Sequence, residues 1–363
     1  MMKNKATKLG LRKKIALDLF AKYYQQKVKE HPLDTLFWEC TLRCNLSCKH
    51  CGSDCRKESL FKDMPAEDFL RVIDSLTPHV DPHKVMIVVS GGEPLMHKDL
   101  EYVGLELYKR GYPWGMVTNG MALDRARFDS LLRAGLHSIT VSLDGFAEQH
   151  NAFRGNPQSF DRAWNAIQMI SKEKDLVYDV VTCVNQHNFG DLERMKRFLI
   201  DGGVKYWRIF TIFPSGRAAE DPTMFLNHEQ TVELLEFIKK TREEKEIYLT
   251  FACEGFLGGY EAEVRDHFYY CGAGVNVAGI RIDGAISGCT SIRARYDQGN
   301  IYKDDFWEVW DKRFEMYRNR EWTRKDACKD CKVFKYCLGG GMHLRDENQN
   351  MKECLYLTLT ENK

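Results

Sequence analysis

The sequence predicts an α/β fold in which a parallel sheet curves into an open barrel and a small cysteine-rich domain follows it. Between Thr35 and about Pro214, short β-rich runs alternate with longer helical patterns, and strands that alternate with helices imply a parallel sheet. Some of these strands, such as 85–89 (VMIVV), are apolar at every position, which implies burial on both faces. From Tyr270 onward cysteines, glycines and aromatic residues become denser and the apolar periodicity weakens, which indicates a domain held by metal more than by a large core.

Six strand–helix units are expected in the barrel. The predicted strands are Leu36–Thr41, Val85–Ser90, Trp114–Thr118, Ser138–Leu143, Val177–Val184 and Tyr206–Phe213. The predicted helices between them are Ala66–Leu76, Leu100–Arg110, Arg125–Arg133, Phe160–Ser171 and Leu192–Ile200. Gly or polar residues end each strand, and a β/α barrel holds its chemistry at that edge.

Four regions follow from these patterns. We expect an N-terminal amphipathic helix (1–34), the barrel (35–215), a connecting segment (216–265) and a cysteine-rich domain (266–363). In the first region Ile15, Leu19, Phe20 and Tyr23 share one helical face, which we expect to pack on the domain. A membrane-surface or partner-binding helix is the alternative, because its polar face is basic. The connecting segment contains a helical pattern, Glu229–Lys240, and a strand-like run, 247–251.

Composition limits the cellular setting. The chain has 363 residues, a net charge of +1 and 13 cysteines, without a convincing secretory signal. An odd number of cysteines in such a chain indicates a reducing, cytoplasmic compartment in which thiols serve as ligands. No apolar run approaches the roughly 20 residues that a membrane span requires. The balanced charge gives no sign of nucleic-acid binding, so we predict neither a nucleic-acid partner nor a membrane span.

The most informative motif is Cys44-x3-Cys48-x2-Cys51 in the segment CTLRCNLSCKHCG. It supplies three thiolates, whereas an iron–sulfur cube has four irons to ligate, so one iron stays open to a non-protein ligand. A zinc site is the alternative, in which Cys48 and Cys51 form one knuckle and Cys44 is surplus.

This motif resembles the signature of the radical S-adenosylmethionine (SAM) superfamily, with His50 at the aromatic position before the third cysteine. The resemblance implies a partial (β/α)6 TIM-like barrel and a [4Fe-4S] cluster whose open iron binds the amine and carboxylate of SAM. It also implies reductive cleavage of SAM to a 5′-deoxyadenosyl radical, so that Cys44, Cys48 and Cys51 are metal ligands and catalytic residues. His50 is expected to contact the cofactor.

The same resemblance assigns further SAM contacts at the strand ends. Gly91, Gly92 and Glu93 match the loop that binds the SAM amino group, although a GGE turn is common by itself. The remaining expected contacts are Thr118, Asn119, Ser142, Asp144 and Arg154. Arg154 is expected to pair with the SAM carboxylate, and a surface salt bridge is the alternative.

The C-terminal cysteines resemble the SPASM extension, which usually holds two auxiliary [4Fe-4S] clusters. The resemblance assigns the outer cluster to Cys328, Cys331, Cys337 and Cys354, with a zinc ribbon as the alternative. It assigns Cys271 and Cys289 to the inner cluster. The family's next cysteine would stand at position 341, which is Gly341 here.

The departure at Gly341 leaves three possibilities for the inner cluster. Cys253 is recruited and one iron stays open, or His343 or Asp346 substitutes as a ligand, or the inner cluster is absent or smaller. Three other cysteines match no ligand spacing. We expect Cys40 and Cys183 to be buried thiols and Cys55 to be a bystander, with hydrogen donation to a substrate radical as its alternative.

The predicted function is that of a radical SAM oxidoreductase that works under anaerobic conditions. We expect it to abstract hydrogen from a peptide or protein, as in maturation of ribosomal peptides (RiPPs) or sulfatases, with flavodoxin or ferredoxin as electron donor. The alternative substrate is a small-molecule cofactor or tetrapyrrole precursor. A zinc-stabilised binding module is the non-enzymatic alternative. It would leave the GGE segment (91–93) and the SLDG segment (142–145) unexplained.

Overall fold

One mixed sheet organises the protein. The computed structural model describes residues 8–252 and 254–360. The ten strands of this sheet are β1 (Thr35–Thr41), β2 (Met86–Gly91), β3 (Trp114–Thr118), β4 (Leu136–Ser142), β5 (Val177–Val184), β6 (Tyr206–Thr211), β7 (Tyr248–Phe251), β8 (Val277–Ile280), β9 (Ala285–Ser287) and β10 (Gly299–Asn300). Their order is β10-β9-β8-β1-β2-β3-β4-β5-β6-β7, and every neighbouring pair from β1 to β7 is parallel.

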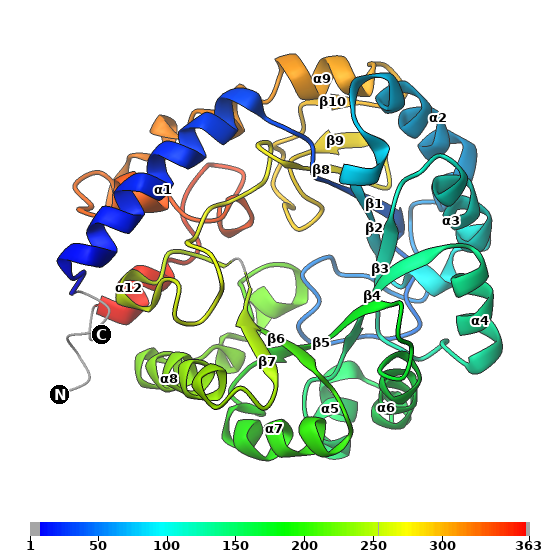
Figure 1. The fold of residues 1–363 in the computed structure, drawn as a ribbon, viewed down its shortest axis with the longest axis horizontal. Coiled ribbons are helices and arrows are strands. Elements are labelled where there is room, and N and C mark those ends of the chain that lie inside the picture. The colour runs from blue at the N-terminus through cyan, green and yellow to red at the C-terminus, as the bar shows by residue number, and fades with distance from the viewer. Residues whose placement is uncertain (1–7, 253, 361–363) are drawn as a thin grey trace.

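The sheet curls into an open barrel whose helices lie on the outside (Figure 1). The helices are α1 (Leu11–Glu30), α2 (Ala66–Leu76), α3 (Leu100–Lys109), α4 (Arg125–Arg133), α5 (Ala147–Arg154), α6 (Ser159–Ile170), α7 (Leu192–Asp201), α8 (His228–Glu244), α9 (Phe306–Lys312), α10 (Glu315–Arg318), α11 (Phe334–Cys337) and α12 (Leu355–Thr360). The predicted α/β fold, with its open parallel barrel and cysteine-rich C-terminal region, is confirmed.

Two elements depart from the expected six units. The strand-like run that we placed in the connecting segment is β7, which pairs in parallel with β6 and extends the barrel by one strand. Helix α5 was not predicted, although Gly155 stops it in the left-handed conformation (φ 72°), a frequent helix end. This helix matters for the site because it carries His150 and Arg154.

Three tryptophans fill the core between the strands and their helices. Trp38, Trp114 and Trp207 have no exposed surface. Each indole N–H is satisfied: Trp114 donates to the Ala134 carbonyl at 3.0 Å, and Trp207 donates to the Thr182 hydroxyl at 2.9 Å. Such buried aromatic anchors, paired at their polar atoms, fix the strands whose ends hold the site.

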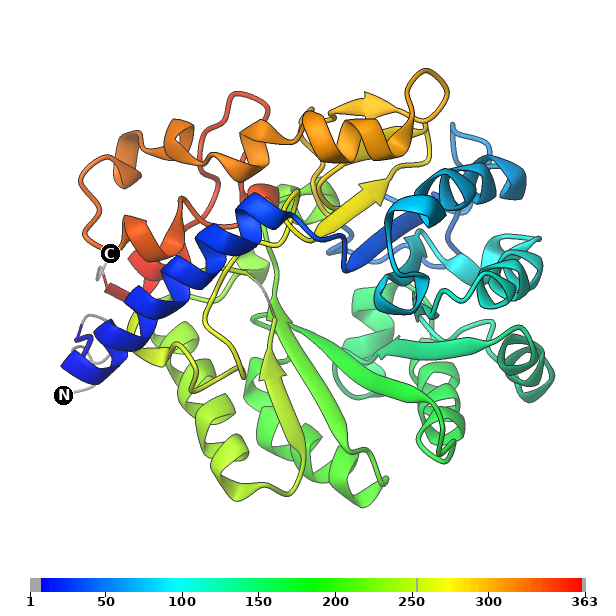
Figure 2. The same cartoon turned by 45° about the horizontal axis from the view of Figure 1, so that its top comes forward.

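The C-terminal region is continuous with the barrel sheet. Strand β8 pairs in parallel with β1, and β9 and β10 follow it in antiparallel pairing. Helix α1 runs across this region, as both views show (Figures 1 and 2). The auxiliary-cluster segment is therefore fixed to the strand that precedes the Cys44 motif.

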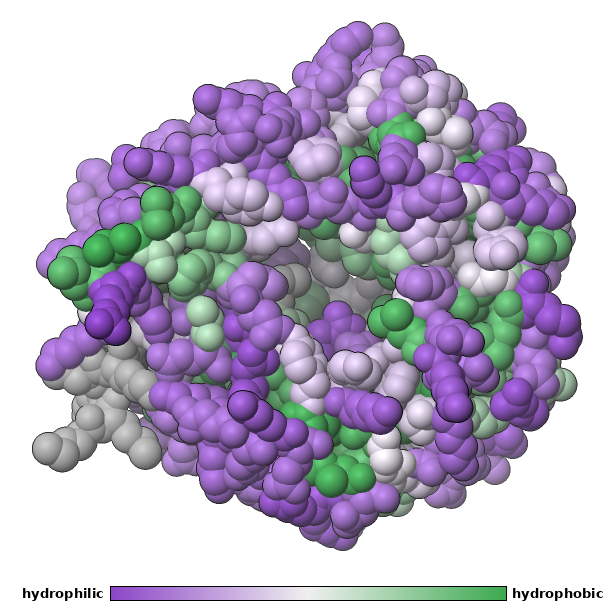
Figure 3. All heavy atoms as spheres, in the orientation of Figure 1, coloured by the Kyte–Doolittle hydropathy of each residue, from purple (hydrophilic) through white to green (hydrophobic). Residues whose placement is uncertain are grey.

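Helix α1 packs on the domain, but the predicted face is only partly covered: Phe20 contacts the Phe268 and Tyr270 rings at centroid distances of 5.5 and 6.0 Å. Leu17 and Tyr24 are the buried residues, whereas Ile15, Leu19 and Tyr23 are 52–62% exposed. Apolar side chains lie on both faces of this helix, so periodicity alone could not identify the packed one. The exposed side chains form a hydrophobic patch in Figure 3. None of the helices in the described ranges has the length and apolar character needed to cross a bilayer.

Candidate active site

The Cys44 motif lies in a loop at the carboxyl end of β1, which we call the cluster loop (residues 42–56). Cys44 and Cys48 are 7% and 8% exposed, and they share an apolar cluster with Leu46, Cys51 and Cys55. Burial raises the pKa of Cys44 to about 12, whereas hydrogen bonding with Cys55 lowers the pKa of Cys51. Buried thiols gathered on one short loop suit a cluster that displaces their protons on binding.

Cys55 belongs to this group more closely than the sequence indicated. Its side chain is 3% exposed, and its backbone N–H donates to the Cys51 Sγ at 3.4 Å. Hydrogen bonds to ligand sulfurs tune an iron–sulfur cluster. The local sequence gave no spacing signal for this contact, because Cys55 fits no ligand pattern.

The Gly91-Gly92-Glu93 turn packs directly on the cluster loop. Gly92 N–H donates to the Thr41 carbonyl at 2.7 Å, and Glu93 N–H donates to the Arg43 carbonyl at 2.9 Å. A Cβ at Gly91 would lie 2.1 Å from the Thr41 oxygen, and Gly91 has φ +133°. The close contact between the end of β2 and the cluster loop therefore requires glycine at position 91, independently of any role in SAM binding.

The Glu93 carboxylate is buried and faces the end of β3. It accepts from the Thr118 hydroxyl at 2.7 Å and from the Asn119 N–H at 2.8 Å, and burial raises its pKa. Asn119 in turn donates to Asn45 Oδ1 at 2.8 Å and lies 3.8 Å from Cys44 Sγ. The predicted residues at the ends of β2 and β3 thus meet beside the first cysteine.

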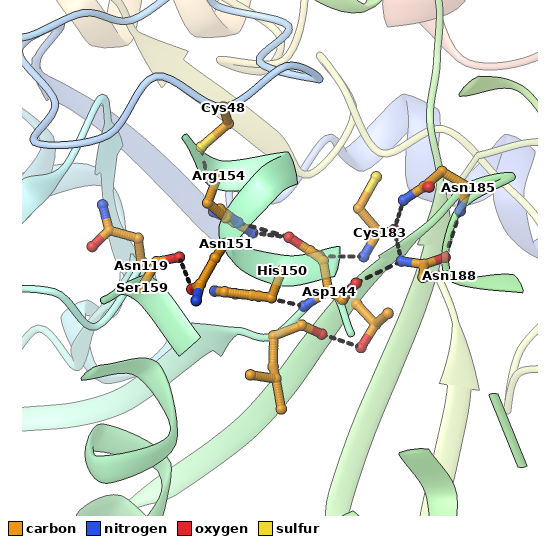
Figure 4. A network of polar contacts seen from close by, with 12 residues as sticks. Cys48, Asn119, Asp144, His150, Asn151, Arg154, Ser159, Cys183, Asn185 and Asn188 are labelled. Carbon is orange, nitrogen blue, oxygen red and sulfur yellow. Dashed lines mark hydrogen bonds and ion pairs between the residues drawn. The ribbon is translucent and has the colours of Figure 1, made fainter. Parts of the chain in front are cut away.

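The ends of β4 and β5 meet through Asp144 (Figure 4). Asp144 Oδ2 accepts from Arg154 Nε at 2.7 Å, and its Oδ1 accepts from the Cys183 N–H at 2.8 Å. Arg154 Nη1 lies 3.8 Å from Cys48 Sγ. Arg154 is 8% exposed, so a surface salt bridge is excluded for this residue.

This arrangement bears on the expected SAM contacts. Both Asp144 oxygens already have protein partners, while Ser142, at the end of β4, is buried nearby on the same strand end. The assignment of Ser142 and Asp144 to SAM, and of Arg154 to its carboxylate, stays a prediction. Asn188, which sequence reasoning missed, also donates to the Asp144 carbonyl oxygen at 2.8 Å.

Two buried imidazoles lie at the site, and one of them keeps an unsatisfied nitrogen among the described residues. His50 stacks on Phe153 with ring centroids 4.1 Å apart, and its Nδ1 has no hydrogen-bond partner among the described residues. His150 Nδ1 accepts from the Asp144 N–H at 2.9 Å, and a hydrogen bond with the Ser159 backbone acts against the effect of burial on its pKa. Burial, assisted by the Arg154 charge, lowers the pKa of His50 to about 3 and that of His150 to about 4. Unpartnered buried polar atoms are costly, so they fit a site completed by a polar cofactor such as SAM.

A segment after β6 clamps the cluster loop from the opposite side. Arg217 Nε donates to the Cys48 carbonyl at 2.8 Å, and its Nη1 donates to the Cys55 carbonyl at 3.1 Å. The absent Cβ of Gly216 would lie 2.4 Å from the Cys51 oxygen, and Gly216 has φ +53°. The sequence gives no spacing signal for this contact between the segment after β6 and the cluster loop.

The four cysteines expected at the outer cluster line one cavity in the C-terminal region. Cys328, Cys331, Cys337 and Cys354 surround it together with Gly339 and Gly340. We call these four thiols and their cavity the outer site. Four thiolates around one cavity fit a closed [4Fe-4S] cluster. Among the residues that the structure describes, no three His, Cys, Asp or Glu side chains are arranged to hold a single metal ion.

The inner-cluster residues are less complete. Burial is the main cause that raises the pKa of Cys289, and hydrogen bonds with Ser291 lower it. The neighbouring Cys271 also raises this pKa, so the two thiols lie close enough to interact electrostatically. A Cβ at Gly341 would lie 2.6 Å from the His343 ring. His343 therefore occupies the space where the family's cysteine would point.

Asp346 and Cys253 are the remaining candidate ligands of the inner cluster. The Asp346 carboxylate accepts from the backbone N–H groups of Asn348 and Asn350 at 2.9 and 2.8 Å, so it caps its own turn. Cys253 lies outside the described residues. The inner ligand set stays a prediction.

Comparison with known families agrees with this geometry. The Radical SAM superfamily model matches residues 38–199, and the SPASM iron-sulfur cluster-binding domain model matches residues 271–332. The chain is 30% identical to the mycofactocin maturase MftC of Mycobacterium ulcerans over 328 residues, which cover 86% of this chain and 85% of that protein. It is 25% identical to an AdoMet-dependent heme synthase of Oleidesulfovibrio alaskensis, with 85% of each chain covered.

A solved structure shows the same fold at low identity. Streptococcus suis SuiB bound to S-adenosylmethionine superposes with a TM-score of 0.68 and 18% sequence identity, covering 88% of this chain and 76% of SuiB.

Proposed function

Because this chain belongs to the radical SAM superfamily and carries a C-terminal SPASM domain, we propose that it abstracts hydrogen from a peptide or protein substrate during maturation of that substrate. The observation that carries the substrate class is the likeness to the mycofactocin maturase, which is 30% identical along most of both chains. When bound, SAM and a [4Fe-4S] cluster supply the hydrogen-abstracting radical.

Different residues at the carboxyl ends of the barrel strands bind the cluster, position its loop and bind SAM. Cys44, Cys48 and Cys51 hold the cluster, and the Arg217 clamp and the Asn119 contact fix their loop. Glu93 is a buried acceptor suited to the SAM ammonium, and His50 offers a neutral nitrogen to its polar groups. Positioning a radical next to one substrate hydrogen depends on such fixed neighbours.

The face drawn in Figure 3 is hollowed near its centre, and both hydrophilic and hydrophobic side chains border the hollow. We propose that the substrate enters the barrel through this hollow.

A small-molecule substrate is the second candidate, because heme synthases match 85% of this chain. The two candidates can be separated by deuterium transfer. Reconstituted enzyme, SAM and dithionite would be incubated, without oxygen, with the peptide fraction of cells grown on perdeuterated amino acids. We expect deuterated 5′-deoxyadenosine by mass spectrometry.

The matched arm contains Fe-coproporphyrin and unlabelled peptides. Conversion of the porphyrin, with no deuterium taken from peptides, would replace our proposal with the tetrapyrrole alternative. Absence of 5′-deoxyadenosine from both arms, with SAM intact, would contradict radical catalysis itself. A chain with alanine at the three motif cysteines provides the background.

The electron source and compartment complete the proposal. We propose that flavodoxin or ferredoxin reduces the enzyme in a reducing, oxygen-poor cytoplasm, since the described cysteines are all free thiols. Flavodoxin and its reductase should then replace dithionite in the assay; failure of both carriers to do so would contradict this part.

A further inference from the structure

Two arginines beside the outer site are buried without a carboxylate partner. Arg320 is 4% exposed and Arg345 is 2% exposed. Within residues 8–252 and 254–360, their recorded acceptors are backbone carbonyls and one thiol, and the Nε of each has no acceptor. Their charges therefore lack a visible counter-ion.

Such an arrangement favours a nearby anion, although the Trp322 ring, 5.5 Å from the Arg345 guanidinium, stabilises part of that charge. A guanidinium cannot give up its proton in a protein, so burial cannot neutralise it. Removing a charge from water is expensive unless an opposite charge compensates it. Here both guanidiniums are held in one place, because Arg345 binds the Gly339 carbonyl and Arg320 binds the adjacent Gly340 carbonyl.

The thiols of the outer site are where an anion would sit. Arg345 Nη2 lies 3.9 Å from Cys328 Sγ in hydrogen-bonding geometry. Arg320 lines a second cavity together with Cys271 and Cys337, and Cys337 belongs to the outer site as well.

We propose that Arg345 and Arg320 are the counter-charges of the outer cluster and raise its reduction potential, Arg345 through direct contact with the Cys328 ligand. A cubane held by four thiolates is an anion, and it gains further negative charge on reduction. Nearby positive charge and hydrogen bonds to sulfur stabilise the reduced form. The outer cluster is thereby suited to accept an electron from the barrel. This inference depends on the SPASM cluster and is independent of the substrate class.

A purely structural role makes a different prediction. Arg345 Nη2 also donates to the Gly339 carbonyl at 2.9 Å, and Arg320 Nη2 donates to the Gly340 carbonyl at 2.8 Å. If the arginines only brace this glycine turn, replacing them would alter stability or iron content but leave the potential of any cluster that forms unchanged.

The test is a redox titration of full-length, anaerobically reconstituted protein. Cys44, Cys48 and Cys51 would be alanine in every variant, so that the electron paramagnetic resonance signal reports auxiliary clusters alone. The outer signal is identified as the one absent when Cys328 and Cys331 are also alanine. Into this background we would introduce Arg345→Gln, Arg320→Gln, Arg345→Lys and the control Arg295→Gln. Arg295 is in the same region but its side chain is 88% exposed.

We expect the midpoint potential of the outer cluster to become more negative in Arg345→Gln and, to a smaller extent, in Arg320→Gln. Arg345→Lys should retain most of the parent value, and Arg295→Gln all of it. Full iron content with an unshifted midpoint in both glutamine variants would overturn the proposal. If Arg345→Gln loses the cluster, retention in Arg345→Lys would support a charge requirement. Equal loss in both would overturn the proposal in favour of a structural brace.

Discussion

Arg154 connects Asp144 to the cluster loop: its Nη2 lies 2.6 Å from Asp144 Oδ2, and its Nη1 lies 3.8 Å from Cys48 Sγ. One side chain of α5 thus joins the end of β4 to a predicted cluster ligand (Figure 4). The pair is almost fully buried, which makes it a sensitive point of the fold as well as of the site.

Breaking this pair from one side should be costly. Arg154→Gln leaves the Asp144 charge buried without compensation, so we expect the metal-free chain to lose about 3–5 kcal/mol of unfolding free energy. Urea unfolding would measure the loss. The exposed pair Arg125–Asp129 is the matched control, and Arg125→Gln should cost less than about 1 kcal/mol. Equal effects of the two substitutions would show that the Arg154–Asp144 pair contributes little.

Acid should destabilise the metal-free chain through His150. The pKa of His150 falls from 6.5 to about 4 on folding, so the unfolded chain binds more protons between these values. Stability is therefore fully present above pH 6.5 and declines toward pH 4, by about 3 kcal/mol for this group. His150→Gln keeps an acceptor for the Asp144 N–H and should flatten the decline. Urea midpoints across that range would test this, and an unchanged slope would contradict it.

The Arg217 clamp should control retention of the radical SAM cluster. Gly216→Ala places a Cβ 2.4 Å from the Cys51 carbonyl oxygen and strains a positive φ, so the cluster loop must move. We expect iron at the motif to be lost while the outer site remains loaded. Gly190→Ala is the control, since a Cβ there meets nothing within 4 Å. Iron and sulfide analysis with electron paramagnetic resonance would check the result; equal loading of both variants would contradict the clamp.

Iron counts should separate the three sites. Fully reconstituted protein should contain about 8 irons with two clusters and about 12 with three. Alanine at Cys44, Cys48 and Cys51 should remove about 4, and alanine at Cys328, Cys331, Cys337 and Cys354 should remove about 4 more. Replacing Cys271 and Cys289 together tests the inner cluster. An iron count that the first substitution leaves unchanged would refute the ligand assignment.

The ligand motifs and most of the barrel could be predicted from the sequence because they are local. The spacing of Cys44, Cys48 and Cys51 fixes three thiols on one loop, and the alternation of apolar strands with helices fixes a parallel sheet. By contrast, α5 was missed because it is short and its one strong sequence signal for a helix is Gly155, which marks only its C-terminal end. The packed face of α1 was only partly predicted, because Phe20 packs on the domain together with Leu17 and Tyr24, whereas the other predicted residues stay exposed.

The sequence by itself determined the chemistry that the chain can host: three thiols for a cluster with an open iron, four thiols for a closed one, and a missing cysteine at Gly341. Only the tertiary structure decided which distant side chains surround those thiols. Arg154, Arg217 and Arg345 lie 106, 169 and 17 residues from the cysteines they contact, at separations for which sequence has no spacing rule. For Arg154 and Arg217 the parallel sheet sets the partner, because the carboxyl ends of its strands lie at one edge. Arg345 meets Cys328 through the packing of the C-terminal region.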